Sequence, residues 1–250
     1  MSQKISALAI TLNEEDNVAR YVESLSFVDE IIFIDSGSTD NTVAIAQKMG
    51  VKVIEHTFEN FSDQRNFGIK QAKNDWILFF DLDEIVSEKL KNEIVSNVNN
   101  PGKNVAYSVR RNYYFMGKLI KFGGWQNDKV IRCFNKNFCD FKGLVHEKVA
   151  ANGHVAKLKN TLNHYSYKSF DNYNDKLNKY SQLQATNLFE KGVKPNAYHF
   201  IIRPLYRFLW QYFFRLGILD GKEGFILAYV HSFSVFKRYL QLWMMYRKIE

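Results

Sequence analysis

Residues 76–84 read Trp-Ile-Leu-Phe-Phe-Asp-Leu-Asp-Glu, an apolar run that ends in Asp81 and Asp83. The run has strong β tendency and no turn residue, which predicts a buried strand at 76–80. Carboxylates at positions i and i+2 project the same way from an extended chain end. Two like charges held close together are unfavourable unless a positive group lies between them. The stretch therefore predicts a site for a hard divalent cation, Mg²⁺ or Mn²⁺, that carries a phosphorylated ligand.

Strands alternate with helices on the N-terminal side of this stretch. Apolar runs at 5–11, 30–35 and 51–55 predict three further strands, with helical patterns between them. This alternation predicts an α/β fold with a mostly parallel, Rossmann-like sheet. Ligands on such sheets bind at the carboxyl ends of strands, where Asn13, Asp35 and the Asp81/Asp83 pair all fall.

The pattern changes after residues 99–102, which read Asn-Asn-Pro-Gly. Residues 105–111, 129–134 and 148–165 predict strands separated by aromatic loops, and a helical pattern returns at 173–191. We therefore expect a catalytic domain at 1–170, with a nucleotide-binding half at 1–100 and an acceptor-side half at 101–170. A helical C-terminal extension is expected at 171–250.

Charge is distributed unevenly over the 250 residues. Residues 1–100 carry 9 Lys and Arg against 17 Asp and Glu, whereas residues 101–250 carry 25 against 9. The basic half is also rich in aromatic residues, a combination that favours an anionic surface such as membrane headgroups or a lipid-linked sugar. Nucleic acid is not expected as a partner, because no recognition motif occurs. Two cysteines in no zinc or disulfide pattern, and no signal peptide, predict a cytoplasmic location.

The expected helix after residue 197 carries a polar stripe on an otherwise apolar sequence. Arg203, Arg207, Gln211 and Arg215 recur every four residues, and the charges exclude a simple transmembrane span. One interpretation is an interfacial helix in peripheral contact with the cytoplasmic face of the inner membrane. The other is a helix that packs on the domain or forms a homo-oligomer. The sequence leaves both open, and it predicts a break near Asp220-Gly221.

Four segments in a fixed order carry a resemblance to a known family. They are Ile10-Thr11-Leu12-Asn13-Glu14, Ile34-Asp35-Ser36-Gly37-Ser38-Thr39-Asp40, Gln64-Arg65-Asn66-Phe67-Gly68 and Asp81-Leu82-Asp83-Glu84. Their order and spacing resemble those of the family 2 glycosyltransferases with the GT-A fold. The resemblance continues through Gly124-Trp125, Arg132-Cys133-Phe134 and Val145-His146-Glu147. The C-terminal Arg203-Pro204 and Asp220-Gly221 resemble the bacterial lipopolysaccharide-core glucosyltransferase (WaaE/KdtX-like) branch.

The resemblance implies an inverting, metal-dependent hexosyltransferase. Its donor would be a nucleotide-sugar, expected to be a UDP-hexose, and its acceptor a glycan or a lipid-linked acceptor such as lipopolysaccharide core. A metal held by Asp83, with Asp81 nearby, would stabilise the charge that develops on the leaving diphosphate. His164 is a further candidate metal ligand. The donor-binding residues implied are Thr11, Asn13, Glu14, Asp35, Arg65, Asn66 and Asp81.

Inverting transfer also needs a base that takes the proton of the acceptor hydroxyl. Glu147 occupies the place of the family's later acidic motif and is the first candidate, with Asp128 as the rival. Trp125, Arg132 and His146 are expected on the acceptor side, where an indole ring can stack on a sugar.

Two other functions are compatible with parts of the sequence. A non-catalytic nucleotide-sugar-binding protein would use the same fold and donor site. A phosphatase of the haloacid-dehalogenase type would use Asp81 as its nucleophile, although its motif usually opens the chain and here begins at residue 81.

Overall fold

The computed structural model of the protein describes residues 2–125, 128–143, 148–166 and 170–249. The chain forms two compact units, one of residues 1–111 with 128–164 and the other of residues 112–127 with 165–250. Residues 112–127, expected in the acceptor-side half, thus group with the C-terminal helices.

The first unit is built around a mixed sheet with the strand order β3-β2-β1-β4-β8-β6-β11-β5. Its parallel part pairs β1 with β2 and β4, and β2 with β3. The pairings of β4 with β8, of β8 with β6 and of β11 with β5 are antiparallel. The strands are β1 (Ile5–Thr11), β2 (Glu30–Asp35), β3 (Lys52–Glu55), β4 (Trp76–Phe79), β5 (Glu84–Ile85), β6 (Asn104–Phe115), β8 (Lys129–Asn135) and β11 (His154–His164). A separate antiparallel pair consists of β9 (Cys139–Lys142) and β10 (Lys148–Ala151).

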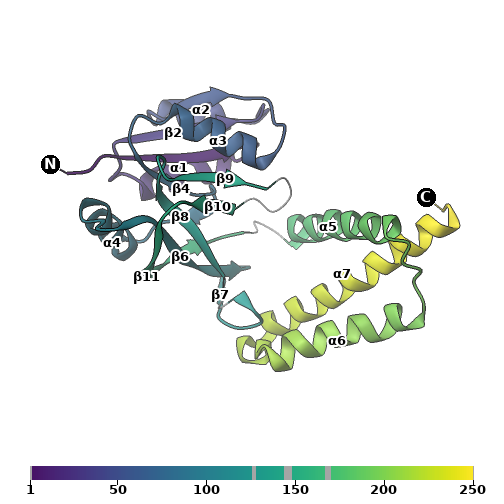
Figure 1. The fold of residues 1–250 in the computed structure, drawn as a ribbon. Coiled ribbons are helices and arrows are strands. Elements are labelled where there is room, and N and C mark those ends of the chain that lie inside the picture. Colours follow the sequence, from purple (N-terminus) through teal and green to yellow (C-terminus); the bar gives the residue numbers. More distant parts are fainter. Residues whose placement is uncertain (1, 126–127, 144–147, 167–169, 250) are drawn as a thin grey trace. The chain divides into compact units, whose positions relative to one another are not determined.

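Helices connect the parallel strands, as the alternation predicts (Figure 1). They are α1 (Glu15–Ser24), α2 (Thr42–Lys48) and α3 (Phe61–Gln71), and a fourth helix, α4 (Glu88–Asn99), lies between β5 and β6. Side-chain oxygens of Asn60 and Ser87 accept hydrogen bonds from the first turns of α3 and α4. The carboxylate of Asp40 serves two helices at once, because it accepts from the amides of Glu15 (3.1 Å) and Thr42 (2.9 Å). These bonds satisfy amides that a helix cannot satisfy internally.

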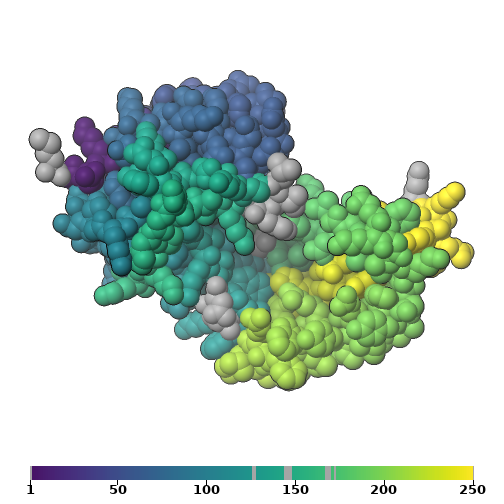
Figure 2. Space-filling model, viewed as in Figure 1, coloured from purple at the N-terminus to yellow at the C-terminus, as the bar shows by residue number. Residues whose placement is uncertain are grey.

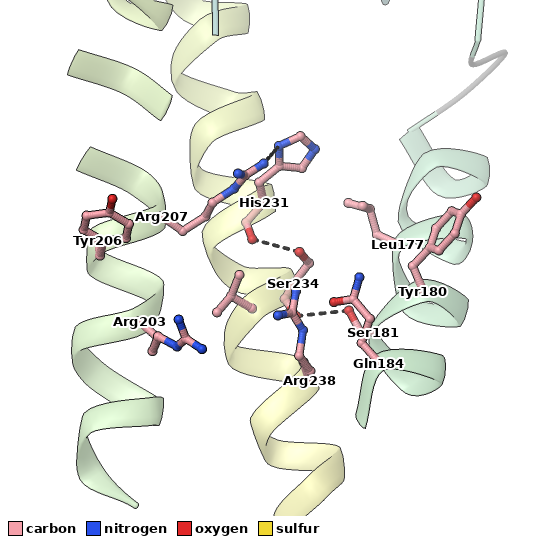
Figure 3. A pocket seen from close by; sticks show the side chains of 11 residues that line it. Leu177, Tyr180, Ser181, Gln184, Arg203, Tyr206, Arg207, His231, Ser234 and Arg238 are labelled. Carbon is pink, nitrogen blue, oxygen red and sulfur yellow. Dashed lines mark hydrogen bonds between the residues drawn. The ribbon is translucent and has the colours of Figure 1, made fainter. Parts of the chain in front are cut away.

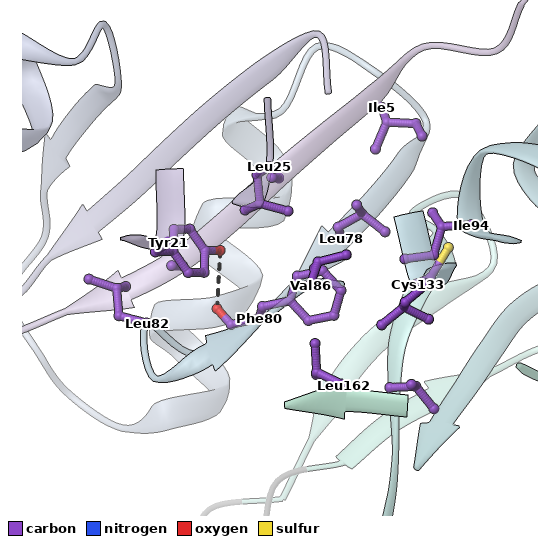
Figure 4. Close-up of a cluster of buried hydrophobic side chains, with 14 of the residues drawn as sticks. Ile5, Tyr21, Leu25, Leu78, Phe80, Leu82, Val86, Ile94, Cys133 and Leu162 are labelled. Atoms are coloured by element: carbon purple, nitrogen blue, oxygen red, sulfur yellow. Dashed lines mark hydrogen bonds between the residues drawn. The ribbon is translucent and has the colours of Figure 1, made fainter. Parts of the chain in front are cut away.

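Buried side chains alternate between the two faces of the sheet, as the period of a strand requires. Leu78 and Phe80 belong to one apolar cluster, whereas Ile77 and Phe79 belong to the other. Tyr21 lies fully buried in the first cluster, and its hydroxyl donates toward the carbonyls of Leu8 (3.3 Å) and Phe80 (3.4 Å; Figure 4). The phenol therefore ties α1 to the end of β4, immediately before Asp81.

The second unit consists of a short strand pair and long helices. The end of β6 pairs with β7 (Lys118–Ile120), and α5 spans Phe170–Glu190. A helical run follows, in which α6 (Arg203–Leu209) lies between π-helical turns at Tyr198–Ile202 and Trp210–Phe214. A 3₁₀ turn at Gly217–Asp220 leads into α7 (Gly221–Arg247), which packs against both α5 and α6 (Figure 1).

The break between the last two helices lies close to its predicted position. Leu216 adopts a left-handed backbone conformation with φ 59°, and α7 begins at Gly221. A Cβ at Gly224 would collide with the carbonyl of Gly217, so only glycine permits this approach. Among the helices that the structure describes, none combines the length and apolarity needed to cross a bilayer.

Candidate active site

The carboxyl ends of β1 and β2 lie side by side, and Thr11 is the register partner of Asp35. Asp35 is buried and accepts hydrogen bonds from the Thr11 hydroxyl (2.7 Å) and from the backbone amides of Gly37 (3.0 Å) and Ser38 (2.7 Å). The Ser38 hydroxyl donates a fourth bond of 2.6 Å. A carboxylate offers about four acceptor sites, so Asp35 is saturated by the loop that follows it. These hydrogen bonds fix the loop after β2 at the edge of the sheet.

Asn13 and Glu14 fix the neighbouring loop to the same segment. Asn13 has φ 55°, and its side-chain oxygen accepts from the amide of Thr39 (2.8 Å). The Glu14 amide donates to the hydroxyl of Thr42 (2.7 Å). Asn13 is highly exposed, whereas Glu14 is half-buried. The expected donor residues on the first two strands are thus gathered at one edge, and Asn13 has a face open to solvent.

Asp81 follows β4 and is held by two arginines. Arg65 donates to one carboxylate oxygen at 3.0 Å, and Arg132 donates to the other. Burial acts to raise the pKa of Asp81, but the charges of Arg132 and Arg65 outweigh it and keep the pKa well below its usual range. Asp81 is therefore ionised at neutral pH, and its negative charge is balanced by the protein itself.

This pair belongs to a larger network in which three arginines alternate with three carboxylates. Glu84 has no exposed side-chain surface and pairs with Arg132 at 2.9 Å and with Arg111 at 3.0 Å. Arg111 also donates two bonds to Asp128, at 2.8 and 3.1 Å. Burial acts to lower the pKa of Arg132, but the negative charges of Asp81 and Glu84 outweigh burial and raise the pKa above its usual value. Arg132 therefore remains charged. Neither Arg111 nor Glu84 is among the predicted site residues.

Asp83 and His164 meet at the edge of the same site. β11 pairs with β5 so that His164 is opposite Glu84, and this register brings His164 Nε2 to 3.3 Å from Asp83 Oδ2. The other oxygen of Asp83, Oδ1, is buried and has no hydrogen-bond partner among the residues that the structure describes. Such an oxygen is suited to a hard divalent cation, and the histidine nitrogen adds a second donor. In the described part of the chain, no group of three or more His, Cys, Asp or Glu side chains is arranged to hold a metal.

The fold agrees with comparisons to known proteins. The model of the family described as "Glycosyl transferase family 2" matches residues 6–147. The chain belongs to glycosyltransferase family 2. An uncharacterized glycosyltransferase of Rickettsia conorii is 32% identical over 97% of this chain and 90% of that protein. The lipopolysaccharide core biosynthesis glycosyltransferase LpsC of Rhizobium meliloti is 27% identical, over 94% of this chain and 93% of that protein.

A solved structure shows the same fold at low sequence identity. Glucosyl-3-phosphoglycerate synthase from Mycobacterium tuberculosis, in complex with phosphoglyceric acid, has a TM-score of 0.50 and 17% identity. The similarity covers 78% of this chain and 82% of that one. With the strand order, it confirms the predicted α/β fold of GT-A type. Membership of a glycosyltransferase family also removes the phosphatase alternative.

Two predicted donor residues of this family 2 glycosyltransferase lie on α3. The Arg65 guanidinium is 5.6 Å from the ring centre of Phe79 and 5.1 Å from that of Phe141. The Asn66 side-chain amide donates to the Phe141 carbonyl and accepts from its amide, both at 2.9 Å. Asn66 therefore joins α3 to β9, while Arg65 is directed to Asp81.

The predicted acceptor residues are distributed over both units of the glycosyltransferase. Arg132 is part of the buried ion network in the first unit. Trp125 belongs to the second unit, where its ring stacks on Tyr113 with centres 4.9 Å apart and lies 5.5 Å from the His231 ring. Glu147 and His146, expected as base and acceptor residue, lie outside the described residues.

Proposed function

We propose that this chain is a metal-dependent, inverting hexosyltransferase that uses a nucleotide-sugar donor, UDP-hexose, and a glycan or lipid-linked acceptor. The observation that carries the proposal is Asp83, whose buried Oδ1 has no partner among the residues that the structure describes and whose Oδ2 lies 3.3 Å from His164. Asp83 follows β4, the strand that pairs with β1, in a chain of family 2. A carboxylate oxygen that is free to bind a metal, in a chain with the motifs of a glycosyltransferase family, favours catalysis over donor binding alone.

Asp83 and His164 would hold Mg²⁺ or Mn²⁺. Mg²⁺ in proteins is commonly held by one or two carboxylates together with substrate phosphates and water, so a small protein ligand set is sufficient. When bound, the cation supplies a Lewis acid for the departing diphosphate. Asp81, also expected at the metal, has both oxygens paired with arginines in this structure. We therefore assign Asp81 to fixing the geometry of the strand end beside Asp83.

Glu147 is our proposed base. Its rival, Asp128, accepts a hydrogen bond on each oxygen from Arg111. A carboxylate whose two oxygens are both held by a guanidinium is engaged in a charge-assisted pair and is less available to an acceptor hydroxyl. This favours Glu147 for the removal of the acceptor proton, and Asp128 for holding Arg111.

We propose a lipid-linked acceptor of lipopolysaccharide-core type, used at an anionic membrane surface. The name of LpsC, which is similar over nearly the whole chain, favours this acceptor class. The second unit adds a physical argument, because its α6 helix and neighbouring turns expose large apolar side chains beside arginines. They include Ile201, Ile202, Leu205, Tyr206, Phe213 and Phe214, and Figure 2 shows α6 (light green) at the visible surface. Apolar surface with adjacent positive charge is typical of interfacial helices.

The Asp83→Asn variant tests the central proposal. We expect it to lose at least about 100-fold in transfer rate, as when a group that stabilises developing charge is removed. The rate would be measured as release of UDP from UDP-glucose with Mn²⁺ and purified lipopolysaccharide core. Asp140→Asn, at an exposed aspartate on β9, is the matched control and should retain full activity. Full activity in Asp83→Asn would remove the metal assignment, and donor binding without any turnover in the wild type would favour the non-catalytic alternative.

Glu147→Gln tests the base. We expect turnover to fall by about 100-fold or more, while the Mn²⁺-dependent thermal stabilisation by UDP-glucose is unchanged, because binding of the donor does not need the base. Asp128→Asn is the companion variant. A larger loss of turnover in Asp128→Asn than in Glu147→Gln would reverse the assignment.

A further inference from the structure

A cavity of about 470 Å³ lies among the helices α5, α6 and α7, entirely within the second unit. Three arginines line it, Arg203 and Arg207 from α6 and Arg238 from α7. In Figure 3 the side chains of these arginines extend into the space between the helices. Arg203 and Arg207 are exposed and Arg238 is half-buried, so the cavity is open to solvent on the α6 side.

No carboxylate neutralises these arginines in the part of the chain that the structure describes. None of the three takes part in an ion pair, and the buried Nε of Arg238 has no hydrogen-bond partner there. Carboxylates of the same unit are engaged elsewhere: Asp220 accepts from the amides of Lys121 and Phe122, and Glu223 pairs with Lys118. The cavity therefore holds positive charge that no described side chain of the protein neutralises.

The arginines also act on one another. The pKa of Arg238 is lowered, first by burial and then by the positive charges of Arg203 and Arg207. A group that brings negative charge would relieve this repulsion. The only hydrogen bonds of Arg203 and Arg207 to side chains in the described residues go to neutral groups, the Tyr239 hydroxyl at 3.0 Å and His231 Nδ1 at 3.4 Å.

His231 is kept neutral by its surroundings, so it orients an arginine without adding charge. Burial, with the nearby charge of Arg207, lowers the pKa of His231 to about 3. Its Nδ1 faces the Gln211 side-chain oxygen at 2.8 Å as well as Arg207, and its Nε2 bonds with the Tyr173 hydroxyl. The imidazole is thus fixed on both sides, and the guanidinium of Arg207 is held beside it at the wall of the cavity.

We propose that this cavity binds a phosphate group, through the guanidinium groups of Arg203, Arg207 and Arg238. The planar fork of a guanidinium matches two phosphate oxygens, and three forks without carboxylates favour a multiply charged phosphate over a single carboxylate. The apolar side chains exposed on α6 next to Arg203 and Arg207, Leu205 at 50% and Tyr206 at 58%, favour a lipid headgroup as the source of the phosphate. Binding needs no donor, metal or transfer step; only the lipid source rests on the membrane contact proposed above.

The test compares the full-length wild type with Arg238→Gln and with Lys179→Gln. Lys179 is an exposed lysine on α5 that does not line the cavity, so the two variants lose the same charge at different places. Calorimetric titration with inorganic pyrophosphate measures the soluble arm. Flotation with phosphatidylcholine vesicles, with or without phosphatidic acid, measures the lipid arm. We expect about tenfold weaker binding in Arg238→Gln, the loss of one charge-assisted bond, and no change in Lys179→Gln.

The two arms separate the possible sources. Binding of pyrophosphate and of phosphatidic acid vesicles, both weakened by Arg238→Gln, supports the site and its lipid ligand. Pyrophosphate binding without vesicle binding supports the phosphate site and overturns the lipid source. No binding in either arm, or equal weakening in Lys179→Gln, overturns the site. Thermal unfolding of both variants confirms that they are folded, and Arg238→Lys, which keeps the charge, provides a folded substitute that should recover part of the affinity.

Discussion

Two sets of three arginines in this chain have opposite surroundings. Arg65, Arg111 and Arg132 alternate with Asp81, Glu84 and Asp128 in the first unit, so that each guanidinium has a carboxylate partner. Arg203, Arg207 and Arg238 share a cavity in the second unit and have no carboxylate partner among the described residues. The same side chain therefore stabilises structure in one unit and remains available to an external anion in the other. The presence of partners, rather than the count of arginines, distinguishes a structural network from a binding site.

The largest effect is expected from Glu84→Gln in the paired set. This substitution removes the carboxylate that Arg132 and Arg111 share, so that three arginines of the network face only the two carboxylates of Asp81 and Asp128. Breaking a buried ion pair on one side costs about 3–5 kcal/mol of unfolding free energy, because an uncompensated charge remains in the interior. Urea denaturation followed by circular dichroism measures the loss.

The control for that variant is Glu88→Gln, which removes a carboxylate 81% exposed and 3.3 Å from Lys91. Exposed ion pairs contribute about 0–1 kcal/mol, so this variant should unfold close to the wild type. If Glu84→Gln were as stable as Glu88→Gln, the network would not stabilise the first unit and the contrast between the two sets would fail.

A smaller effect is expected from acid, through Asp81. Its pKa is lower in the folded protein than the value of about 3.9 in an unfolded chain. A lowered pKa stabilises the fold above the unfolded value, and this contribution is lost progressively as the pH falls below about 4, amounting to roughly 2 kcal/mol for one such aspartate. Denaturation midpoints measured between pH 7 and pH 3 should fall more steeply for the wild type than for Asp81→Asn. If the denaturation midpoints of the two proteins fell equally with pH, the lowered pKa of Asp81 would be contradicted.

The smallest effect is expected in the unpaired set. Arg207→Gln removes a charge that has no carboxylate partner and is repelled by its neighbours, so the unfolding free energy should change by no more than about 0.5 kcal/mol. The same denaturation experiment applies, with Arg132→Gln as its counterpart in the paired set. A loss of several kcal/mol in Arg207→Gln would mean that the cavity arginines are structural after all.

The local sequence pattern was sufficient to predict the strands in the parallel part of the sheet. Strands expected at 5–11 and 30–35 have these same bounds, and that expected at 76–80 ends one residue earlier, at Phe79. These runs are buried and bounded by turn residues or by carboxylates, so their periodicity is visible without tertiary information. The helix break near Asp220-Gly221 was also foreseeable, because glycine there permits a turn that other residues resist.

The charge network was not visible in the sequence. Arg132 and Asp81 are 51 positions apart, and Arg111 and Glu84 are 27 apart. Their pairing depends on the antiparallel addition of β8 beside β4 and of β6 beside β8, which no local period encodes. For the same reason Arg132 was expected at an acceptor, whereas the structure brings it to Asp81. The two-residue strand β5, which sets the register of His164 opposite Glu84, is too short to leave a pattern.

The carboxylate of Asp40 has one more consequence, for the way the first unit opens. Because it accepts from the amides of both Glu15 and Thr42, the first turns of α1 and α2 share a single acceptor. When one helix end frays, the Asp40 carboxylate moves with it and the other helix end loses its acceptor as well. We therefore expect the two ends to open as one cooperative segment. The loops with Asn13 and with Gly37-Ser38 lie directly before these two helix ends. We therefore expect this edge of the sheet to open as a unit, with similar protection of both loops in amide hydrogen exchange.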